Sequence, residues 1–417
     1  MFKFIHAADI HLDSPQRGLS NYEGAPVGEI RGATRKALEN LVSLAVEEKV
    51  AFVLIVGDLY DGEWEDFNTG LFFGIQMARL RDEGIPLILL RGNHDAASKM
   101  TKDLRLLENT KLLSMERPET YIPDDLGVAF HGQSFAKRAE MTNLAKGYPE
   151  GVAGLFNIGL LHTCVEGREG HENYAPCSLD DLRFKGYGYW ALGHIHKRET
   201  LIDADPVVAF PGNIQGRSVR ETGPKGCLLV TVEGGEVSKV EPRWLDVARW
   251  DICRVDAMGA EDGDELLQRF RDRLSLMIPE AEDRLLAVRV EVSGACRAHA
   301  ELSSDWNYWV NEVRQTATEG SGGRVWVEKV IAKTRMTARL EDDQGDGPMG
   351  ELNALLEELR EDAGLLKALC DVELEDLRKK LDPKLLDELD APERLRELLD
   401  QVGPLLRTRL GAHGGEG

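Results

Sequence analysis

Cysteine is scarce in this sequence and is never clustered. The chain has 417 residues and six cysteines, which are spread from Cys164 to Cys370 without any C-x-x-C pair. This distribution excludes a disulfide-stapled scaffold and a zinc finger built on thiolates, and it is typical of the reducing cytoplasm. The chain also lacks a run of about 20 apolar residues and a start that resembles a signal peptide. We therefore expect a cytoplasmic protein without a membrane span.

Positive charge is in short supply as well. The chain has 51 Lys and Arg against 73 Asp and Glu, which gives a formal net charge of −22. A phosphate-handling protein with this charge needs bound metal, a local basic rim or a partner, because it is no polycation overall. The acidity is uneven, since residues 351–400 contain 16 acidic and 8 basic residues. This stretch is expected to be a separate region.

Short apolar runs alternate with amphipathic segments in the first part of the chain, residues 1–244. Runs such as 51–57 and 85–92 are largely apolar, and the residues between the runs place Leu38, Leu41 and Ala45 on one helical face. Buried strands that alternate with helices predict a layered α/β domain. A hairpin that turns at Gly234-Gly235 is expected near its end.

Further parts are predicted after residue 244. Three strand patterns alternate there with two helical stripes of apolar residues, which predicts a small α/β cap domain at 245–337. The polar, glycine-bearing segment 338–350 is expected to be a linker. Residues 351–417 are rich in leucine and acidic residues, which predicts short amphipathic helices. These helices would either fold back on the cap or dock onto a partner protein, and the sequence leaves both alternatives open.

Histidines and carboxylates gather where the predicted strands end. Five motifs carry them: Asp9-Ile10-His11, Gly57-Asp58-Leu59-Tyr60-Asp61, Gly92-Asn93-His94-Asp95, His162 and Gly193-His194-Ile195-His196. Ligands of open α/β sheets bind at the carboxyl ends of strands, so the motifs are expected to meet at one edge. Imidazoles and carboxylates without a thiolate suit a divalent metal ion. Because residues two apart on extended backbone point to the same side, Asp9 with His11 and His194 with His196 are expected to converge.

The ordered set of motifs resembles the calcineurin-like metallophosphoesterases. More narrowly, ADIHLDSP, GDLYD, RGNHD, GYWALGHIH and FPGNIQGR are similar to motifs of SbcD/YhaO-type DNA repair exonucleases. The resemblance implies a β-sandwich flanked by helices and two divalent metal ions, which are Mn²⁺ in the family, although the donor set alone would also allow iron, zinc or nickel. It implies that one ion is held by Asp9, His11 and His196, the other by Asn93, His162 and His194, and that Asp58 bridges both.

The resemblance also implies a catalytic residue, His94. This histidine would donate a proton beside the scissile phosphate, and Asp95 would orient its ring. Asp61 departs from the family pattern, because some nuclease members have a second catalytic histidine at this position. A carboxylate cannot bring positive charge to a phosphate, so Asp61 is expected to support the metal ligands instead.

Basic residues and two other histidines complete the set of candidates. Arg217, Arg220 and Lys225 follow the FPGN turn and are predicted to contact DNA phosphates. His6 and His131 are expected to form structural hydrogen bonds and not to bind metal.

Three functions remain open at this stage. The narrow resemblance and the cap favour a metal-dependent DNA nuclease, an exonuclease with or without endonuclease activity, in double-strand-break repair or end processing. A phosphodiesterase or phosphatase for a small nucleotide or lipid headgroup would use the same centre, and the net charge of −22 favours it. A non-catalytic scaffold is disfavoured by the His94-Asp95 pair, because a structural metal site needs no proton donor.

The resemblance further implies partners. SbcD-type nucleases act on DNA with an SbcC-like coiled-coil ATPase that binds their C-terminal part, which here is 351–417. The ATPase would supply the DNA-binding surface that this acidic chain lacks. The family also suggests a homodimer formed through helices around 68–83 and 98–114.

Overall fold

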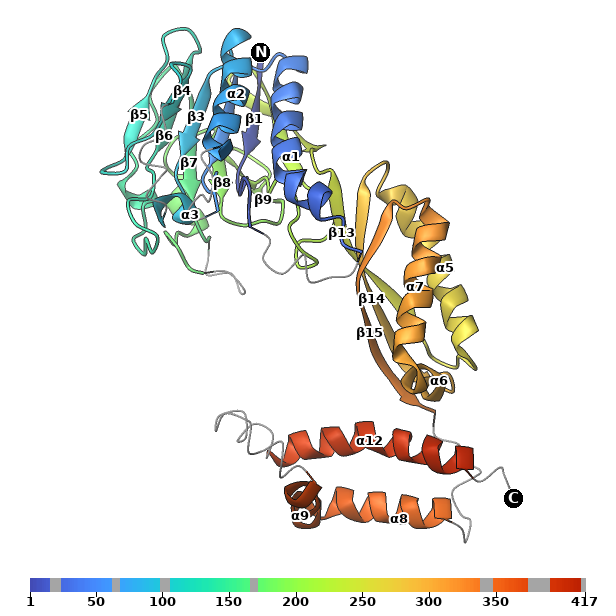
Figure 1. Cartoon of the computed structure of the whole chain (residues 1–417). Coiled ribbons are helices and arrows are strands. Elements are labelled where there is room, and N and C mark those ends of the chain that lie inside the picture. The colour runs from blue at the N-terminus through green and yellow to red at the C-terminus, as the bar shows by residue number, and fades with distance from the viewer. Residues whose placement is uncertain are drawn as a thin grey trace. The chain divides into compact units, whose positions relative to one another are not determined.

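Two compact units make up the described part of the chain. The computed structural model describes residues 1–15, 24–61, 68–97, 106–165, 172–337, 348–373 and 391–413 (Figure 1). One unit comprises Met1–Ile252, Ile278–Arg289 and Gly322–Glu328, and the other comprises Cys253–Met277, Val290–Ser321 and Lys329–Gly417. Among the described residues, no helix has the length and apolar character needed to cross a membrane.

The first unit contains a six-stranded sheet in the order β12-β11-β1-β2-β3-β4. Neighbours from β1 to β4 run parallel, and β11 joins β1 in the antiparallel direction. The predicted hairpin at Gly234-Gly235 is confirmed, because β11 and β12 pair on either side of it. The strands are Phe2–Ala7 (β1), Phe52–Val56 (β2), Leu87–Leu90 (β3), Thr110–Leu112 (β4), Gly226–Glu233 (β11) and Glu236–Trp244 (β12).

A second six-stranded sheet has the order β5-β6-β7-β8-β10-β9. Its inner strands β6, β7, β8 and β10 are parallel, and β5 and β9 are antiparallel edge strands. The strands are Glu119–Tyr121 (β5), Val128–Gly132 (β6), Phe156–His162 (β7), Tyr189–Gly193 (β8), Glu199–Ile202 (β9) and Val207–Phe210 (β10).

Alternation along β1 shows how the layers form. Phe4 packs with Phe52 and Phe130 in the core between the two sheets, whereas Ile5 points to the opposite side and packs with Leu41. Strand side chains alternate between the two faces of a sheet, so an apolar strand fills a core on both sides. The helices that cover the outer face of the first sheet are α1 (Val27–Glu47) and α2 (Asn68–Asp82). The predicted layered α/β fold is therefore confirmed.

The outer face of the second sheet has its own core. Leu161 of β7 and Trp190 of β8 pack there with Leu182. Two short helices lie over this face, η3 (Ala145–Gly147) and α4 (Leu179–Arg183).

One helix expected from the family does not form as predicted. The helix around 68–83 corresponds to α2, but residues 110–112 of the segment 98–114 form strand β4. Leu87, Ile88 and Leu89 of β3 pair with these residues, so backbone hydrogen bonds hold them in an extended conformation. Residues 98–105 lie outside the described part of the chain.

The three-stranded sheet that follows has the order β13-β14-β15. Its strands and the helices between them are β13 (Ala248–Asp256), α5 (Gly263–Glu280), β14 (Leu285–Cys296), α6 (His299–Ser304), α7 (Trp306–Ser321) and β15 (Val325–Met336). Leu266 and Phe270 of α5 and Trp309 and Val313 of α7 are buried, as their helical spacing predicts. The alternation of strands and helices is confirmed, and α6 is an element that the sequence reading missed.

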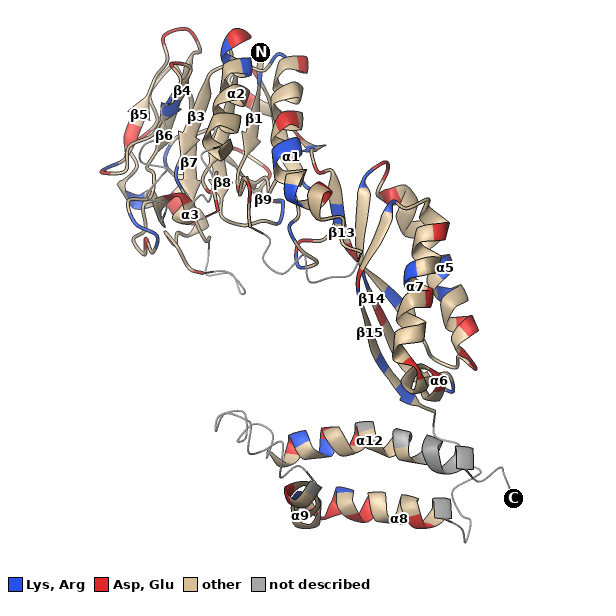
Figure 2. Cartoon of the chain, in the orientation of Figure 1, with Lys and Arg blue, Asp and Glu red and all other residues tan. Residues whose placement is uncertain are grey.

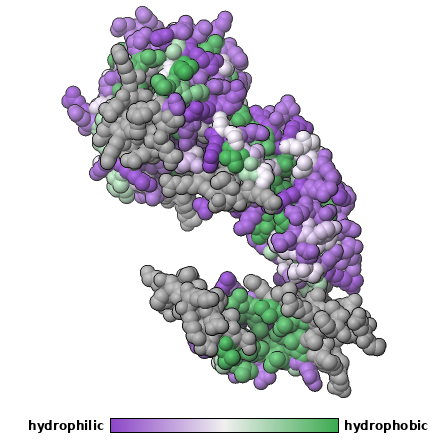
Figure 3. Space-filling view, in the orientation of Figure 1, coloured by the Kyte–Doolittle hydropathy of each residue, from purple (hydrophilic) through white to green (hydrophobic). Residues whose placement is uncertain are grey.

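The C-terminal helices cover their own leucines. Leu359, Leu366 and Leu395 are buried against one another, with Leu398 and Leu399 partly buried beside them. The helix at Pro392–His413 also contacts α6 of the cap, so the predicted fold-back on the cap occurs together with this mutual packing. Apolar surface is still left over, as Figure 3 shows, because Leu355 and Leu369 remain exposed. The helices are α8 (Pro348–Glu361), α9 (Ala363–Glu373) and α12 (Pro392–His413), and residues 338–347 of the predicted linker lie outside the described part.

Candidate metal centre

The five motifs lie at the carboxyl ends of strands from both large sheets. Asp9 and His11 follow β1, Asp58 follows β2, and Asn93 begins the short helix α3 (Asn93–Ala97) after β3. In the second sheet, His162 ends β7, while His194 and His196 follow β8. Groups of potential ligand atoms within 4.8 Å of one another form there: Asp9 with His11 and His196, Asp58 with His162 and His194, and His11 with Asp58 and His94.

The backbone of these motifs is not extended as the spacing argument assumed. Asp9, His11, Asp58 and His194 have φ angles of 52°, 46°, 50° and 100°. Such angles are uncommon for residues other than glycine, and they cluster at functional sites where the surrounding structure enforces them. Backbone bonds tie the first two loops together, from Asp9 N–H to the Gly57 carbonyl (3.1 Å) and from His11 N–H to the Asp58 carbonyl (3.0 Å). As a result, His194 and His196 enter different groups and do not converge, which corrects the expectation from their spacing.

Glycines of three motifs leave the space that the ligands occupy. A Cβ atom at Gly57 would lie 2.2 Å from His162 Nδ1, and one at Gly92 would lie 2.3 Å from Asp58 Oδ1. A Cβ atom at Gly193 would lie 1.9 Å from the Val56 carbonyl oxygen, which is backbone and cannot move aside. The glycines that precede Asp58, Asn93 and His194 are therefore part of the site.

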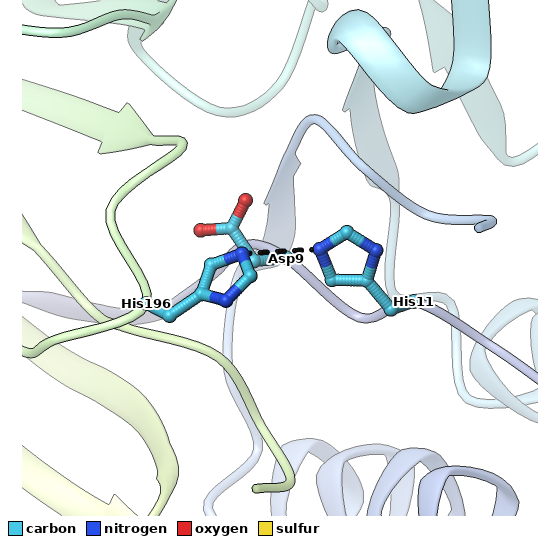
Figure 4. A group of neighbouring side chains, drawn as sticks. All are labelled: Asp9, His11 and His196. Atoms are coloured by element: carbon cyan, nitrogen blue, oxygen red, sulfur yellow. Dashed lines mark hydrogen bonds between the residues drawn. The ribbon is translucent and has the colours of Figure 1, made fainter. Parts of the chain in front are cut away.

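Asp9, His11 and His196 form the first group of donors (Figure 4). His11 Nε2 and His196 Nε2 face each other at 3.1 Å. His196 Nδ1 lies 2.7 Å from Glu221 Oε1, so Nδ1 carries the hydrogen and Nε2 presents its lone pair to the group. His11 Nδ1 is a buried atom without a hydrogen-bond partner among the described residues.

Asp58, His162 and Asn93 form the second group together with His194. His162 Nδ1 donates to the Val56 carbonyl at 3.1 Å, which turns the lone pair of Nε2 toward Asn93 Oδ1 at 3.0 Å. Asp58 Oδ2 lies 3.5 Å from His162 Nε2 and 3.9 Å from His11 Nε2. Asp58 therefore stands between the two groups, where a carboxylate can serve both.

The electrostatics of the centre fit a cation. Burial alone would lower the pKa of His162, but the Asp58 carboxylate outweighs burial and raises this pKa to about 9. Burial raises the pKa of Asp9 to about 6, because the charged carboxylate loses its hydration. The centre thus stabilises added positive charge, which a proton or a divalent ion can supply. Buried nitrogen and oxygen donors with this charge balance fit first-row divalent metals.

Asp61 binds the His94 ring, whereas the sequence analysis predicted Asp95 for this role. His94 Nδ1 lies 2.7 Å from Asp61 Oδ1, and this hydrogen bond raises the pKa of His94 above its usual value although burial opposes the shift. The carboxylate of Asp95 instead accepts the backbone N–H groups of Leu59, Tyr60 and Gly92. Asp95 therefore holds together the loops that follow β2 and β3. The carboxylate that orients His94 is Asp61, the residue that departs from the family pattern.

The predicted basic residues have three different environments. Arg217 lies in the centre, where its guanidinium contacts Asp61 and Glu221. Arg220 is exposed. Lys225 is only 9% exposed and donates to the His196 carbonyl, so it has little surface to offer DNA and instead supports that loop.

Glu221 is a site residue that the sequence reading missed. It binds the His196 ring, the Arg217 guanidinium and the Asn213 amide. One glutamate in a loop gives no periodic or spacing signal, and only its position directly after the predicted DNA contact Arg220 could have drawn attention to it. His6 and His131 are structural as predicted, since the His6 ring binds the Tyr189 hydroxyl and the Leu192 carbonyl, and the His131 ring binds Thr120 and Asn157.

Comparisons with known proteins agree with this centre. Residues 2–198 match the calcineurin-like phosphoesterase family, and residues 250–335 match the middle domain of metallophosphoesterase YhaO. The chain is 38% identical over 275 residues to the uncharacterized metallophosphoesterase YhaO of Bacillus subtilis (strain 168), which covers 65% of this chain and 67% of that protein.

More distant relatives are DNA double-strand break repair proteins Mre11. The chain is 26% identical over 271 residues to the protein of Sulfurisphaera tokodaii, covering 61% of this chain and 65% of that protein. It is 24% identical over 298 residues to the protein of Methanopyrus kandleri, covering 64% and 62% of the two chains. This chain therefore spans less than two thirds of these Mre11 relatives. From its identity to YhaO and its match to the family over the residues that build the centre, the chain belongs to the calcineurin-like metallophosphoesterases.

Proposed function

We propose that this metallophosphoesterase is a metal-dependent nuclease that hydrolyses phosphodiester bonds of DNA. The observation that carries the proposal is the convergence of two groups of metal donors on Asp58, with the partly exposed His94 beside them. Two donor groups that share a carboxylate suit a pair of ions, and a proton donor at their edge suits ester hydrolysis.

The donors divide between two metal positions in this proposal. Asp9, His11 and His196 would hold one ion, Asn93, His162 and His194 would hold the other, and Asp58 would serve both. When bound, the two ions polarise the phosphoryl group and stabilise charge on the attacking and leaving oxygens. Manganese is proposed because the resemblance implies it.

His94 protonates the leaving oxygen. In the reaction, the oxygen of a water molecule bonds to phosphorus and one of its protons passes to solvent, the phosphorus–oxygen ester bond breaks, and the departing alkoxide takes a proton from His94, which solvent then reprotonates. The Asp61 hydrogen bond at 2.7 Å keeps the ring oriented and favours its protonated form. His94 is 33% exposed at its side chain, while His11 is 1% exposed, so substrate reaches the centre from the His94 side.

DNA is proposed as the substrate because two relatives are DNA repair proteins Mre11. The net charge of −22 is the observation that favours the second candidate, a phosphodiesterase for small nucleotides. Acidic and basic residues are interspersed along the described elements (Figure 2). A DNA substrate therefore fits best with a partner that adds basic surface, and an SbcC-like coiled-coil ATPase docked on the C-terminal helices is our proposal for it.

A homodimer through α2 belongs to the same proposal. Leu71 and Ile75 are 65% and 61% exposed and stand one turn apart on this helix. Two large apolar side chains on one exposed helical stripe favour burial against a second protein surface.

Parallel digestions test the proposed function. The chain loaded with Mn²⁺ is incubated with linear duplex DNA, single-stranded DNA and bis-p-nitrophenyl phosphate, and the Asp58→Asn variant is the control. We expect metal-dependent cleavage of DNA and of the small ester, both lost in the variant. Cleavage of the small ester without any cleavage of DNA, even with the ATPase present, would favour the small-nucleotide candidate. Cleavage of neither substrate would contradict both.

A further inference from the structure

Arg217 occupies a central position that the metal donors do not explain. Its Nη1 lies 3.3 Å from Asp61 Oδ2, and its Nη2 lies 3.0 Å from Glu221 Oε1. Its backbone N–H also donates to Glu221 Oε2 at 2.8 Å, which fixes the start of the side chain. The guanidinium is therefore held at both ends by carboxylates of the centre.

Each of these carboxylates is shared with a histidine. Asp61 binds His94 through its other oxygen, and Glu221 binds His196 at 2.7 Å. Arg217 thus connects the proposed proton donor to a proposed metal ligand. Both carboxylates also bind other groups, since Asp61 accepts the Ser14 hydroxyl and Glu221 accepts the Asn213 amide, so neither is devoted to the arginine alone.

Exposure shows which parts of the centre a substrate can reach. The side chains of His11, Asp58 and His162 are at most 2% exposed. Those of Arg217 and Asp61 are each 19% exposed, and those of His196 and His94 are 22% and 33% exposed. The opening of the centre is therefore lined by the row His94, Asp61, Arg217 and His196.

The guanidinium has hydrogen-bonding capacity left at this opening. Its two terminal nitrogens carry four hydrogens, and the bonds to Asp61 and Glu221 use one hydrogen of each nitrogen. His196 Nδ1 lies 3.3 Å from Nη2 but donates its own hydrogen to Glu221, so it cannot accept another. One N–H of each terminal nitrogen therefore has no acceptor among the described residues.

We propose that Arg217 is a phosphate-binding residue of the centre, whose terminal N–H groups bind the non-bridging oxygens of the phosphodiester next to His94. This inference rests on the proposed hydrolysis of phosphodiesters and names the group that recognises them. Two parallel N–H groups match the geometry of phosphate oxygens, and a preorganised cation stabilises the charge that develops on them.

The proposal also accounts for Asp61. Where some nuclease members have a second catalytic histidine, this chain has a carboxylate that carries no positive charge. Asp61 instead holds two cations, His94 on one oxygen and Arg217 on the other. The positive charge that the missing histidine would provide is supplied by Arg217 from a distant part of the sequence.

A purely structural role is the alternative. Arg217 could serve only to position Asp61 and Glu221, in which case its loss would displace His94 and His196. Metal content and phosphate binding separate the two roles, because a phosphate ligand can be removed without removing a metal ligand. The Arg217→Lys variant separates the structural role from the phosphate-binding role further, because lysine keeps the positive charge but lacks the planar pair of N–H donors.

The test compares Arg217→Ala, Arg217→Lys and a matched control, all loaded with Mn²⁺. Arg243 of β12 provides the control Arg243→Ala, because it too lies between two glutamates, Glu48 and Glu241, but stands outside the centre. Metal content is measured by plasma mass spectrometry, affinity for inorganic phosphate by titration calorimetry, and kcat/KM with bis-p-nitrophenyl phosphate and DNA. Added guanidinium ion provides a chemical rescue of Arg217→Ala.

We expect Arg217→Ala to keep wild-type metal content, to bind inorganic phosphate about 10-fold or more weakly, and to lose about 10²–10³-fold in kcat/KM. Guanidinium ion should restore part of the activity, Arg217→Lys should be intermediate, and Arg243→Ala should match the wild type. Unchanged phosphate affinity in Arg217→Ala, or loss of metal in step with activity, would overturn the proposal. If the wild type cleaves no DNA but binds phosphate through Arg217, the substrate proposal fails while the phosphate site stands.

Discussion

The pairing of His94 with Asp61 predicts how cleavage depends on the leaving group. His94→Leu removes the proton donor without removing a proposed metal ligand, so the rate of DNA cleavage should fall by about 10²–10⁴-fold while metal content stays near normal. Asp61→Asn keeps the shape of the side chain but loses the charge that raises the pKa of His94. This loss leaves less of the ring protonated at neutral pH.

The size of the Asp61→Asn effect follows from this hydrogen bond. A hydrogen bond between charged groups contributes about 1.5–3 kcal/mol, and each 1.4 kcal/mol corresponds to a factor of ten. We therefore expect DNA cleavage to fall by about 10–100-fold in Asp61→Asn. The double variant should lose less than the product of the two single losses, because part of the Asp61 effect acts through the His94 ring. Any loss beyond that of His94→Leu alone reports on Arg217, which Asp61 also holds.

Bis-p-nitrophenyl phosphate provides the decisive comparison. Its leaving group, p-nitrophenolate, is a weak base that needs little protonation, so His94→Leu should lose much less activity on it than on DNA. Asp61→Asn should keep on the small ester only the part of its loss that comes from Arg217. We measure steady-state rates on the two substrates and determine metal content by plasma mass spectrometry. Equal losses on both substrates would refute the proton-donor role of His94, and a metal-free His94→Leu protein would make His94 a ligand.

Four further predictions concern the metal bridge, the glycine positions, acid stability and the C-terminal helices. Asp58→Asn should lower metal occupancy and turnover together, because the shared carboxylate loses charge between two cations; wild-type metal content by mass spectrometry would contradict the two-metal assignment. Gly193→Ala should destabilise the fold by about 1–3 kcal/mol in denaturant unfolding, because its Cβ would lie 1.9 Å from the Val56 carbonyl oxygen. Gly28→Ala in α1 is its control and should not destabilise, since nothing lies within 4 Å of the added carbon. Burial lowers the pKa of His6 to about 3 from 6.5, so the unfolded chain takes up the proton first as pH falls. The free energy of unfolding should therefore drop by about 2 kcal/mol more between pH 7 and pH 5 in the wild type than in His6→Gln. Truncation after residue 340 should leave a folded, metal-loaded enzyme that cleaves the small ester but does not co-purify with the proposed coiled-coil ATPase; undiminished co-purification would place that interface elsewhere.

The sequence by itself determined the fold class and the candidate metal donors of the centre. Continuous apolar runs such as Phe52–Val56 can be buried only as strands covered on both faces, and glycine, aspartate and histidine at their ends mark where such strands stop. The carboxyl ends of parallel strands meet at one edge of a sheet, so local patterns were sufficient to place Asp9 with Asp58 in the first sheet and His162 with His194 in the second. These signals lie within short stretches of the sequence, so they can be recognised without knowing which distant residues pack against them.

Only the tertiary structure determined which residues of that centre bind one another. His11 and His196 meet across 185 residues of sequence, and Glu221 reaches His196 from a loop that has no periodic pattern. The left-handed φ angle of His194 sends it to a different group from His196, which an extended register could not predict. Asp61 rather than Asp95 holds His94 because the Asp95 oxygens are taken up by backbone N–H groups from neighbouring loops. Spacing along the chain fixes which side of an element a residue faces, but only the packing of distant loops fixes the partner it finds there.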